Sequence, residues 1–282
     1  MPATATVREQ FEQTGYVISS GLFSADEVAF FRSYFTEMRD RGGDGWAEGG
    51  IDFESPDPLR AYPRLLQPHR GDKVAMDFML DPRLQPILTD ICGETPFAVQ
   101  TMVYFKSPGS RGQALHQDQR YLRCEPGTCM AAWLALDDCD EENGCMYVVL
   151  GSQNLPMICP EVADQEESWG ADYIPPPQGM EAVPAIMKAG DVLFFNGSLI
   201  HGSGKNRSAT RFRRTLIAHY IAAECDKVAH YYFPVYRFDG STVDDGLSAN
   251  PWGGGPCGIP RIVDGDTIYE MVGSIEEARA AH

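Results

Sequence analysis

The chain has 282 residues, of which 43% are hydrophobic and 22% charged, as in ordinary soluble globular domains. Its 40 acidic and 23 basic residues give a formal net charge of −17, which repels nucleic acids and anionic membranes and excludes them as expected partners. No apolar run approaches the length of a membrane span and the first residues lack the apolar core of a signal peptide, so we expect a soluble, cytoplasmic protein.

Helical signals mark the N-terminal part of the chain. Ser24 and Glu27 have the spacing of a capping box, and Gly42–Gly43 end the pattern. Between them, apolar residues recur at helical spacing: Phe30, Phe31, Tyr34, Phe35 and Met38. A second helix is predicted over residues 82–92, with Asp81 as N-cap and Gly93 at its C-terminus. The segment 43–72 is rich in Gly, Pro and charge, and we expect it to be an irregular surface segment.

Strand-like runs replace the helical pattern beyond residue 95. Short runs rich in β-branched and aromatic residues occupy 97–106, 129–138, 145–151, 191–197 and 213–223. Turn residues separate them, and Asn143–Gly144 is a strong signal for a tight turn. Such spacing without intervening helices is typical of antiparallel sheets that close on each other as a sandwich or barrel. The early helices are then expected to cover one outer face.

The cysteines follow no recognisable motif. Eight of them stand at irregular spacings without a CxxC pair, at positions 92, 124, 129, 139, 145, 159, 225 and 257. This pattern predicts reduced thiols rather than a disulfide framework or a zinc ribbon.

A histidine and an aspartate stand two positions apart in "ALHQDQRY", residues 114–121. In a strand, His116 and Asp118 would point to the same face. A third partner, His201, is expected to end an apolar strand-like run and is surrounded by glycines that leave room for another group. Two imidazoles and one carboxylate form the facial triad of non-haem Fe(II) oxygenases, which leaves positions open for a co-substrate and dioxygen. The other histidines are not needed: His69 and His230 are expected at the surface or pocket rim, His219 packed in a strand and His282 at the terminus.

Four blocks of sequence resemble the phytanoyl-CoA dioxygenase family of Fe(II)/2-oxoglutarate-dependent oxygenases. They are "LHQD" (115–118), "AAWLALDDCDEENGCMYVVLGSQ" (131–153), "GDVLFFNGSLIHGSGKN" (190–206) and "FRRTLIAHY" (212–220), in the family's order. The resemblance implies one mainly β domain over 1–282, built on a double-stranded β-helix (jelly-roll, cupin-like) core with flanking helices. Within it we expect a helical N-terminal part (1–95), the core (about 96–222) and a C-terminal substrate-side segment (223–282).

The resemblance also implies the cofactors and their residues. Fe(II), 2-oxoglutarate and O2 are expected, with His116, Asp118 and His201 as the iron ligands. Three further positions match residues around the co-substrate, namely Ser203, Trp133 and Met102. Gln100 lies two residues before Met102 and shares its strand face.

The arginine that binds the distal carboxylate of 2-oxoglutarate is expected at Arg213. A planar guanidinium can bind a carboxylate through two parallel hydrogen bonds. The interval from His201 is slightly longer than in typical members, so Arg211 and Arg214 remain alternatives. Strand alternation places Arg213 on the face of Thr215, Ile217 and His219, and Arg214 on the other. The local basic cluster of Lys205, Arg207, Arg211, Arg213 and Arg214 is otherwise expected to be a solvated loop with one arginine turned inward.

The expected reaction is hydroxylation or desaturation of a small-molecule metabolite, for example in natural-product biosynthesis, with release of succinate and CO2. Asp118 argues against a halogenase, since related halogenases replace this ligand by Gly or Ala. Alternatives are a zinc hydrolase with the same ligands, a non-catalytic jelly-roll binding module and an acyl-CoA hydroxylase. The sequence does not indicate the oligomeric state.

The segments expected to wall the substrate site are acidic, aromatic and rich in glycine. They are residues 161–173 and 238–255, in which Trp169, Tyr173 and Trp252 would supply apolar walls. A CoA ester carries several phosphate charges and needs a basic patch, which these segments do not offer. We therefore predict an uncharged or cationic small metabolite in preference to an acyl-CoA.

Overall fold

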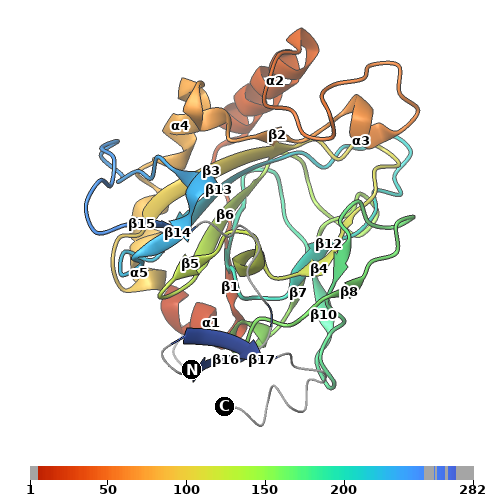
Figure 1. Cartoon of the computed structure of the whole chain (residues 1–282). Coiled ribbons are helices and arrows are strands. Elements are labelled where there is room, and N and C mark those ends of the chain that lie inside the picture. Colours follow the sequence, from red (N-terminus) through yellow and green to blue (C-terminus); the bar gives the residue numbers. More distant parts are fainter. Residues whose placement is uncertain (1–5, 251–256, 258, 264–265, 271–282) are drawn as a thin grey trace, which may run out of the picture.

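The structure is a computed structural model that describes residues 6–250, 257, 259–263 and 266–270. Its centre consists of two antiparallel sheets that face each other (Figure 1). The larger sheet contains, in spatial order, β1 (Tyr16–Ser19), β11 (Val192–Asn196), β6 (Cys129–Ala135), β13 (Thr215–Ile221), β3 (Phe97–Tyr104) and β2 (Leu65–Leu66). The smaller sheet contains β10 (Ala182–Ala185), β7 (Met146–Val149), β12 (His201–Ser203) and β4 (Gln113–His116). This is the predicted jelly-roll arrangement.

Alternating side chains of the larger sheet build two cores. On β6, Trp133 belongs to the core between the sheets, together with Val148 of the smaller sheet. The adjacent Leu134 belongs to a second core, between the larger sheet and the helices. Because successive strand side chains point to opposite faces, a continuous apolar run serves both cores.

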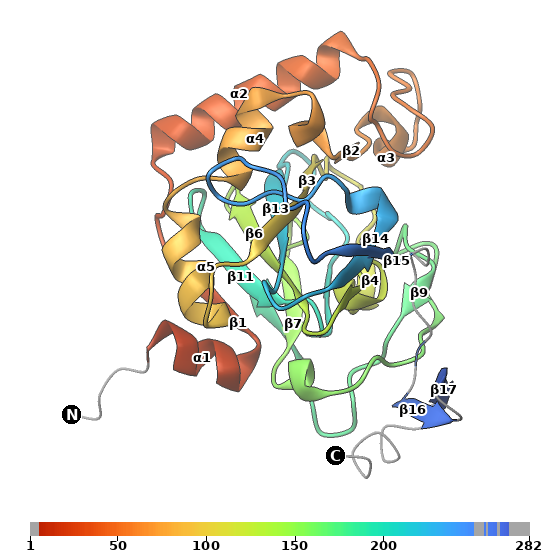
Figure 2. The same ribbon diagram turned by 60° about the vertical axis from the view of Figure 1, so that its left-hand side comes forward.

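Helices cover the outer face of the larger sheet (Figure 2). They are α1 (Val7–Thr14), α2 (Ala25–Arg41), α4 (Lys73–Met79) and α5 (Leu84–Cys92), with the one-turn α3 (Pro58–Ala61) near the sheet edge. The predicted capping box of α2 is confirmed, since Ser24 Oγ accepts from Glu27 N and the Glu27 carboxylate accepts from Ser24 N. No helix within the described ranges is long and apolar enough to cross a membrane.

Two details of the N-terminal part differ from the predictions. Helix α5 begins at Leu84 with Arg83 as N-cap, so the predicted Asp81 cap is wrong. The Asp81 carboxylate instead accepts from the backbone N–H and Nε of Arg83, which holds residues 82–83 in a turn. The segment 43–72 is not irregular throughout, because it contains α3 and β2 and buries Trp46 against Phe105.

All five predicted strand runs are confirmed, as β3, β6, β7, β11 and β13. Gly144 lies in a turn before β7 with φ of 78°, a backbone conformation that favours glycine. Strands β1 and β2 were not predicted; they pair with β11 and β3 at the two edges of the larger sheet.

Smaller elements surround the two main sheets. Three short sheets are formed by β5 (Cys124–Glu125) with β14 (Lys227–Ala229) and β15 (Ser248–Asn250), by β8 (Glu161–Val162) with β9 (Asp172–Tyr173), and by β16 (Ile259–Val263) with β17 (Asp266–Glu270). Short 3-10 helices are η1 (Pro68–Arg70), η2 (Asp118–Arg120), η3 (Ser152–Asn154) and η4 (His230–Tyr232).

A disulfide joins Cys159 to Cys257, whose Cα atoms lie 4.8 Å apart. The prediction of eight reduced thiols is therefore wrong for this pair, while the other six cysteines are free. The fold brings together two residues that are 98 positions apart, and irregular spacing in the sequence gives no sign of such a pairing.

Candidate active site

His116, Asp118 and His201 converge between the two sheets. Their ligand atoms all lie within 4.8 Å of one another. His116 ends β4 and His201 begins β12, and the two residues are direct partners in the antiparallel pairing. Asp118 Oδ1 lies 3.2 Å from His116 Nε2, and Asp118 Oδ2 lies 3.6 Å from His201 Nε2. Two imidazoles and one carboxylate in this arrangement can hold a divalent metal ion.

The backbone around these residues differs from the predicted strands. β4 stops at His116, and Asp118 opens η2 instead of continuing the strand, so a turn rather than strand alternation directs its carboxylate to the imidazoles. His201 does not end the run of β11. Residues 197–200 carry the chain from the larger to the smaller sheet, where His201 begins β12.

Backbone carbonyls orient both imidazoles. His116 Nδ1 lies 2.8 Å from Ala114 O, and His201 Nδ1 lies 2.8 Å from Leu199 O. These contacts turn the Nε2 atom of each ring toward the Asp118 carboxylate. Both side chains are buried, so their orientation is also held by packing. Metal-ligating histidines are commonly fixed in this way.

Asp118 has a third histidine neighbour that the sequence analysis treated as plain strand packing. His219 of β13 places Nε2 3.3 Å from Asp118 Oδ2. Burial alone would raise the pKa of Asp118, but His201 and hydrogen bonds from His116, His201 and His219 hold it well below its usual range. The carboxylate is therefore available as an anionic ligand.

Arg213 is buried two residues before β13. Its guanidinium carbon lies 5.1 Å from the centroid of the Trp133 ring, and its Nε donates to Gly144 O at 3.2 Å. Its Nη1 is buried and has no hydrogen-bond partner among the described residues. Ile217 and His219 line the same cavity as Arg213, so the predicted strand face is the one observed.

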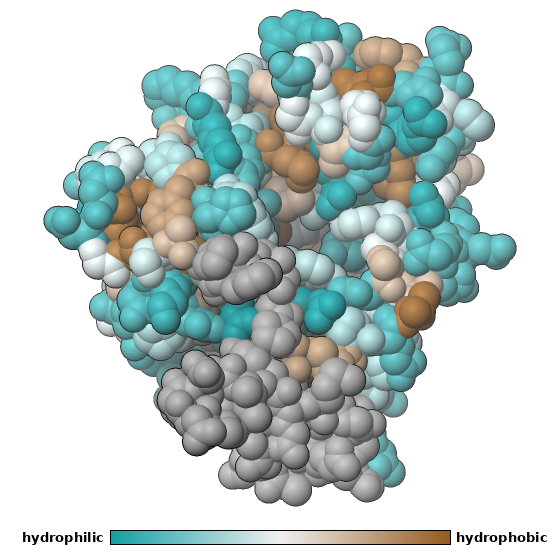
Figure 3. All heavy atoms as spheres, in the orientation of Figure 1, coloured by the Kyte–Doolittle hydropathy of each residue, from teal (hydrophilic) through white to brown (hydrophobic). Residues whose placement is uncertain are grey.

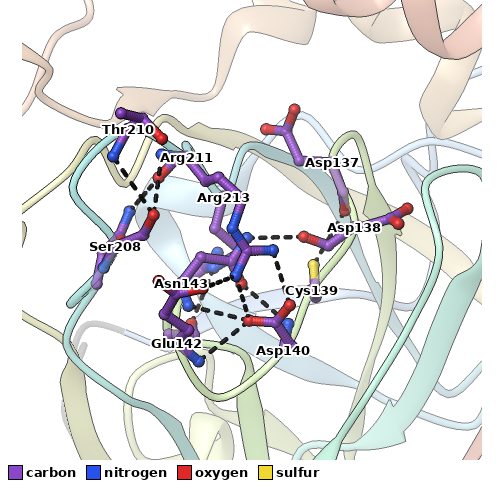
Figure 4. A network of polar contacts seen from close by, with 12 residues as sticks. Asp137, Asp138, Cys139, Asp140, Glu142, Asn143, Ser208, Thr210, Arg211 and Arg213 are labelled. Atoms are coloured by element: carbon purple, nitrogen blue, oxygen red, sulfur yellow. Dashed lines mark hydrogen bonds and ion pairs between the residues drawn. The ribbon is translucent and has the colours of Figure 1, made fainter.

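The alternative arginines are bound to carboxylates on the loop that follows β6. Arg214 donates from Nε and Nη2 to Asp137, at 2.8 Å each. Arg211 donates to both oxygens of Asp140 and to Glu142 (Figure 4). Arg207 and Lys205 lie next to Glu167. The basic cluster is thus largely neutralised by acidic residues, and Arg213 is the arginine turned inward.

Lys106 is a buried cation that the sequence analysis missed. It follows β3 by two residues and donates from Nζ to Ser203 Oγ at 2.8 Å, Gly204 O at 2.5 Å and Gly144 O at 3.3 Å. Burial and the neighbouring Arg213 hold the pKa of Lys106 well below its ordinary value. Ser203 Oγ also accepts from Gln113 N at 3.2 Å, whereas a hydrogen bond between Ser203 and Arg213 is absent from the described contacts. A lone lysine after a strand gives no sequence signal for such burial.

A cavity of about 610 Å³ opens onto these groups. Three of the residues expected around the co-substrate, Gln100, Met102 and Trp133, line it from the larger sheet, and Ser203 lines it from the smaller one. Apolar and aromatic side chains continue the wall outward, among them Leu59, Leu122, Tyr121, Trp169 and Tyr232. Such a largely apolar wall with a few convergent polar groups is typical of small-molecule sites.

The acidic residues of the cavity wall outside the triad are all paired with arginines. Arg64 donates to Glu48 at 2.7 Å and stacks on Trp169, with its guanidinium carbon 3.8 Å from the ring centroid. Arg111 lies 3.3 Å from Asp57, and Arg120 lies 2.9 Å from Asp172. In the described wall, the outer part of the cavity therefore offers no unpaired carboxylate.

The predicted aromatic wall residues and the histidines outside the triad agree with the structure only in part. Trp169 lines the cavity, whereas Tyr173 is not among the described lining residues and Trp252 and His282 lie outside the described residues. His230 is exposed, as expected. His69 is not at the surface or rim, because it is buried with its Nδ1 2.9 Å from Thr101 Oγ1.

Comparisons with known proteins agree with this geometry. A family model described as Phytanoyl-CoA dioxygenase (PhyH) matches residues 11–215. Phytanoyl-CoA dioxygenase 1 of Oryza sativa subsp. japonica is 31% identical over 259 residues, which cover 79% of this chain and 92% of the relative. The peroxisomal phytanoyl-CoA dioxygenase of Rattus norvegicus is 25% identical over 238 residues, covering 79% of this chain and 69% of the relative.

Solved structures show the same fold. The non-heme alpha-ketoglutarate-dependent epimerase SnoN from nogalamycin biosynthesis aligns with a TM-score of 0.63 over 92% of this chain and 95% of its own, at 22% identity. At this level of identity the likeness concerns the fold, and it agrees with the jelly-roll core predicted from the sequence.

Proposed function

Because the chain belongs to the phytanoyl-CoA dioxygenase family of Fe(II)/2-oxoglutarate-dependent enzymes, we propose that it hydroxylates or desaturates a small, uncharged metabolite. The chain is a dioxygenase that uses Fe(II), 2-oxoglutarate and O2. In a hydroxylation, 2-oxoglutarate, O2 and a substrate C–H give succinate, CO2 and a substrate C–OH. Membership of this family rules out the zinc hydrolase and the non-catalytic binding module.

The convergence of His116, Asp118 and His201 is the observation that carries the proposal for the site. Their donor set of two nitrogens and one carboxylate suits Fe(II), and the open cavity beside it leaves room for further ligands. When bound, iron supplies the chemistry that couples oxidative decarboxylation of 2-oxoglutarate to substrate oxidation. The role of the protein is to hold the two Nε2 atoms and the carboxylate on one side of the ion.

Arg213 is proposed to bind the distal carboxylate of 2-oxoglutarate. Its guanidinium carries a buried, unpartnered Nη1 and lines the same cavity as the triad. An anion at this position would satisfy that donor in a site from which water is largely excluded. Met102, Trp133 and Gln100 are proposed to enclose the carbon chain of the co-substrate, since they line the same cavity as Arg213 and the triad residues.

The carboxylate–arginine ion pairs in the outer wall of the cavity favour an uncharged substrate. Each carboxylate of the outer wall already has an arginine partner, so the cationic option that the acidic sequence suggested has no free acid to support it. An acyl-CoA remains the second candidate, because the relatives in Oryza sativa and Rattus norvegicus are named phytanoyl-CoA dioxygenases. The structure argues against an acyl-CoA, because the arginines of the cavity wall are already paired with carboxylates and leave little free positive charge for CoA phosphates. SnoN, named for nogalamycin biosynthesis, supports a natural-product intermediate.

A succinate-release screen tests the substrate assignment. The purified protein would be supplied with Fe(II), 2-oxoglutarate and O2 and mixed with neutral terpenoid and polyketide compounds, amino-acid derivatives and acyl-CoAs. We expect stoichiometric succinate release and product formation with a neutral compound, and none of either in His201→Ala. Coupled turnover of an acyl-CoA in preference to the neutral compounds would contradict the proposed substrate class.

A further inference from the structure

We propose that Lys106 is a positioning residue for the distal carboxylate of 2-oxoglutarate, which it serves by holding the Ser203 hydroxyl as a donor beside Arg213. The inference rests on the proposed function of the site and assigns a role to a residue outside the sequence motifs. Lys106 has no counterpart among the residues predicted from the sequence, and its burial and its contact with Ser203 place it beside the cavity rather than on the surface.

All three N–H groups of the Lys106 ammonium have acceptors in the protein. Ser203 Oγ lies 2.8 Å from Nζ, Gly204 O lies 2.5 Å away and Gly144 O lies 3.3 Å away. An ammonium group has three donors and no acceptor, so this environment satisfies it fully. Lys106 therefore acts on a ligand through Ser203 and through its charge, because no N–H remains for direct contact.

The surroundings of Ser203 leave its hydroxyl hydrogen free. A serine hydroxyl has two lone pairs and one O–H. The lone pairs accept from Lys106 Nζ and, at 3.2 Å, from the backbone N–H of Gln113. No acceptor for the Ser203 O–H occurs among the described contacts, and Ser203 lines the cavity together with Arg213. The hydroxyl is thus available to donate into the cavity, where a carboxylate oxygen can accept.

Lys106 and Arg213 also form a pair of like charges without an acidic partner. Both donate to Gly144 O, Arg213 from Nε at 3.2 Å, and neither forms an ion pair within the described part of the chain. Two buried cations that share one carbonyl are unfavourable until an anion compensates them. The backbone at Gly144 packs closely against the segment that follows β12, because a Cβ on Gly144 would lie 2.4 Å from Gly204 O.

A purely structural role makes the opposite prediction for stability. If Lys106 only joined β12 to the turn at Gly144, its removal would lower the melting temperature of the protein without ligand. If Lys106 is instead a cation that only a bound anion compensates, Lys106→Met removes an uncompensated charge. The melting temperature of the protein without ligand then stays unchanged or rises. The gain in melting temperature on adding 2-oxoglutarate would then shrink, because the ligand has lost a partner.

The experiment compares Lys106→Met with Lys205→Met, a matched substitution at a half-buried lysine of the basic cluster that lies next to Glu167. Anaerobic absorption titrations of the Fe(II) proteins give the Kd of 2-oxoglutarate and of 2-oxobutyrate, which keeps the 2-oxo acid but lacks the distal carboxylate. We expect Lys106→Met to raise the Kd of 2-oxoglutarate at least about tenfold and to leave that of 2-oxobutyrate unchanged. Lys205→Met should change neither value.

Ser203→Ala provides a second test that keeps the lysine. Alone it should weaken 2-oxoglutarate binding, and in the Lys106→Met background it should add little, because the two residues act as one unit. Equal loss of both ligands, fully additive losses, or a lower melting temperature with unchanged Kd would overturn the role of Lys106. Failure of the wild-type Fe(II) protein to bind 2-oxoglutarate would instead refute the proposed function itself.

Discussion

Arg213 and Arg214 are adjacent in the sequence but have different partners, and we therefore expect different roles for them. Arg213→Met should weaken 2-oxoglutarate binding by about 2 to 5 kcal/mol, because it removes the guanidinium proposed to bind a buried carboxylate. Arg214→Met should leave this affinity nearly unchanged and instead lower the melting temperature, because it leaves Asp137 without its bidentate partner. Titration and thermal melting of both variants check this, and the reverse order of effects would contradict the assignment.

The contact between His219 and Asp118 predicts an effect on metal binding. His219 donates from Nε2 to the carboxylate that is proposed to bind iron, and removing such a supporting bond lowers metal affinity about 10- to 100-fold. His219→Phe should therefore raise the Kd for Fe(II), measured by anaerobic titration, while His230→Phe at an exposed position should not. Equal metal affinity of the two variants would show that His219 is only packing.

At the scale of residues, motifs with a defined spacing predicted which side chains lie together at the cavity. The triad and Arg213 were found from short blocks whose residue types suit one chemistry, and the alternation of β13 placed His219 on the correct face. The contacts of His219 and Lys106 could not be found in this way. They depend on the turn after His116 and on the carbonyls of Gly144 and Gly204, which come together through tertiary packing alone.

At the scale of elements, the start of α2 couples stability to pH. Hydrogen bonds from Arg83, and then from Ser24, lower the pKa of Glu27 from 4.5 to about 2. Because the folded-state pKa is depressed, Glu27 stabilises the protein above pH 4.5, and this contribution is lost as the pH falls toward 2. Glu27→Gln should lower the urea midpoint at pH 7, and its difference from wild type should shrink across that window. Glu37→Gln, at an exposed position of α2, serves as the control, and a pH-independent difference for Glu27→Gln would contradict the coupling.

The helices and strands that were predicted correctly are marked by residues within their own sequence or directly beside it. α2 has a capping box and a terminating glycine, and the central strands have long apolar runs bounded by turn residues. β1 and β2 have only four and two residues and exist through pairing with β11 and β3, which are distant in sequence. Strands of this kind have no periodicity to detect.

At the scale of the whole molecule, a net charge of −17 coexists with local ion pairs around the cavity and the basic cluster. Figure 3 shows one face covered mostly by hydrophilic side chains, with separate rather than continuous apolar patches. The net charge argued against a polyanionic partner, but it could not show that the acids near the cavity are already paired with arginines. This pairing changes the expected substrate from uncharged or cationic to uncharged.

The disulfide between Cys159 and Cys257 joins distant parts of the chain and can be tested directly. Alkylation of the unfolded, unreduced protein followed by mass spectrometry should label six thiols, and prior reduction should raise the number to eight. Peptide mapping should find Cys159 and Cys257 unlabelled before reduction. Labelling of all eight cysteines without reduction would show that the chain exists with reduced thiols, as its spacing pattern had predicted.

The most direct test of the central claim is the visible absorption spectrum of the protein with Fe(II) under anaerobic conditions. If His116, Asp118 and His201 hold the ion with open positions beside Arg213, adding 2-oxoglutarate should produce a charge-transfer band that saturates at one equivalent per chain. His201→Ala should give no band, and Arg213→Met should require much more 2-oxoglutarate to reach it. No band in the wild-type protein, or an undiminished band in His201→Ala, would contradict the assignment of this site.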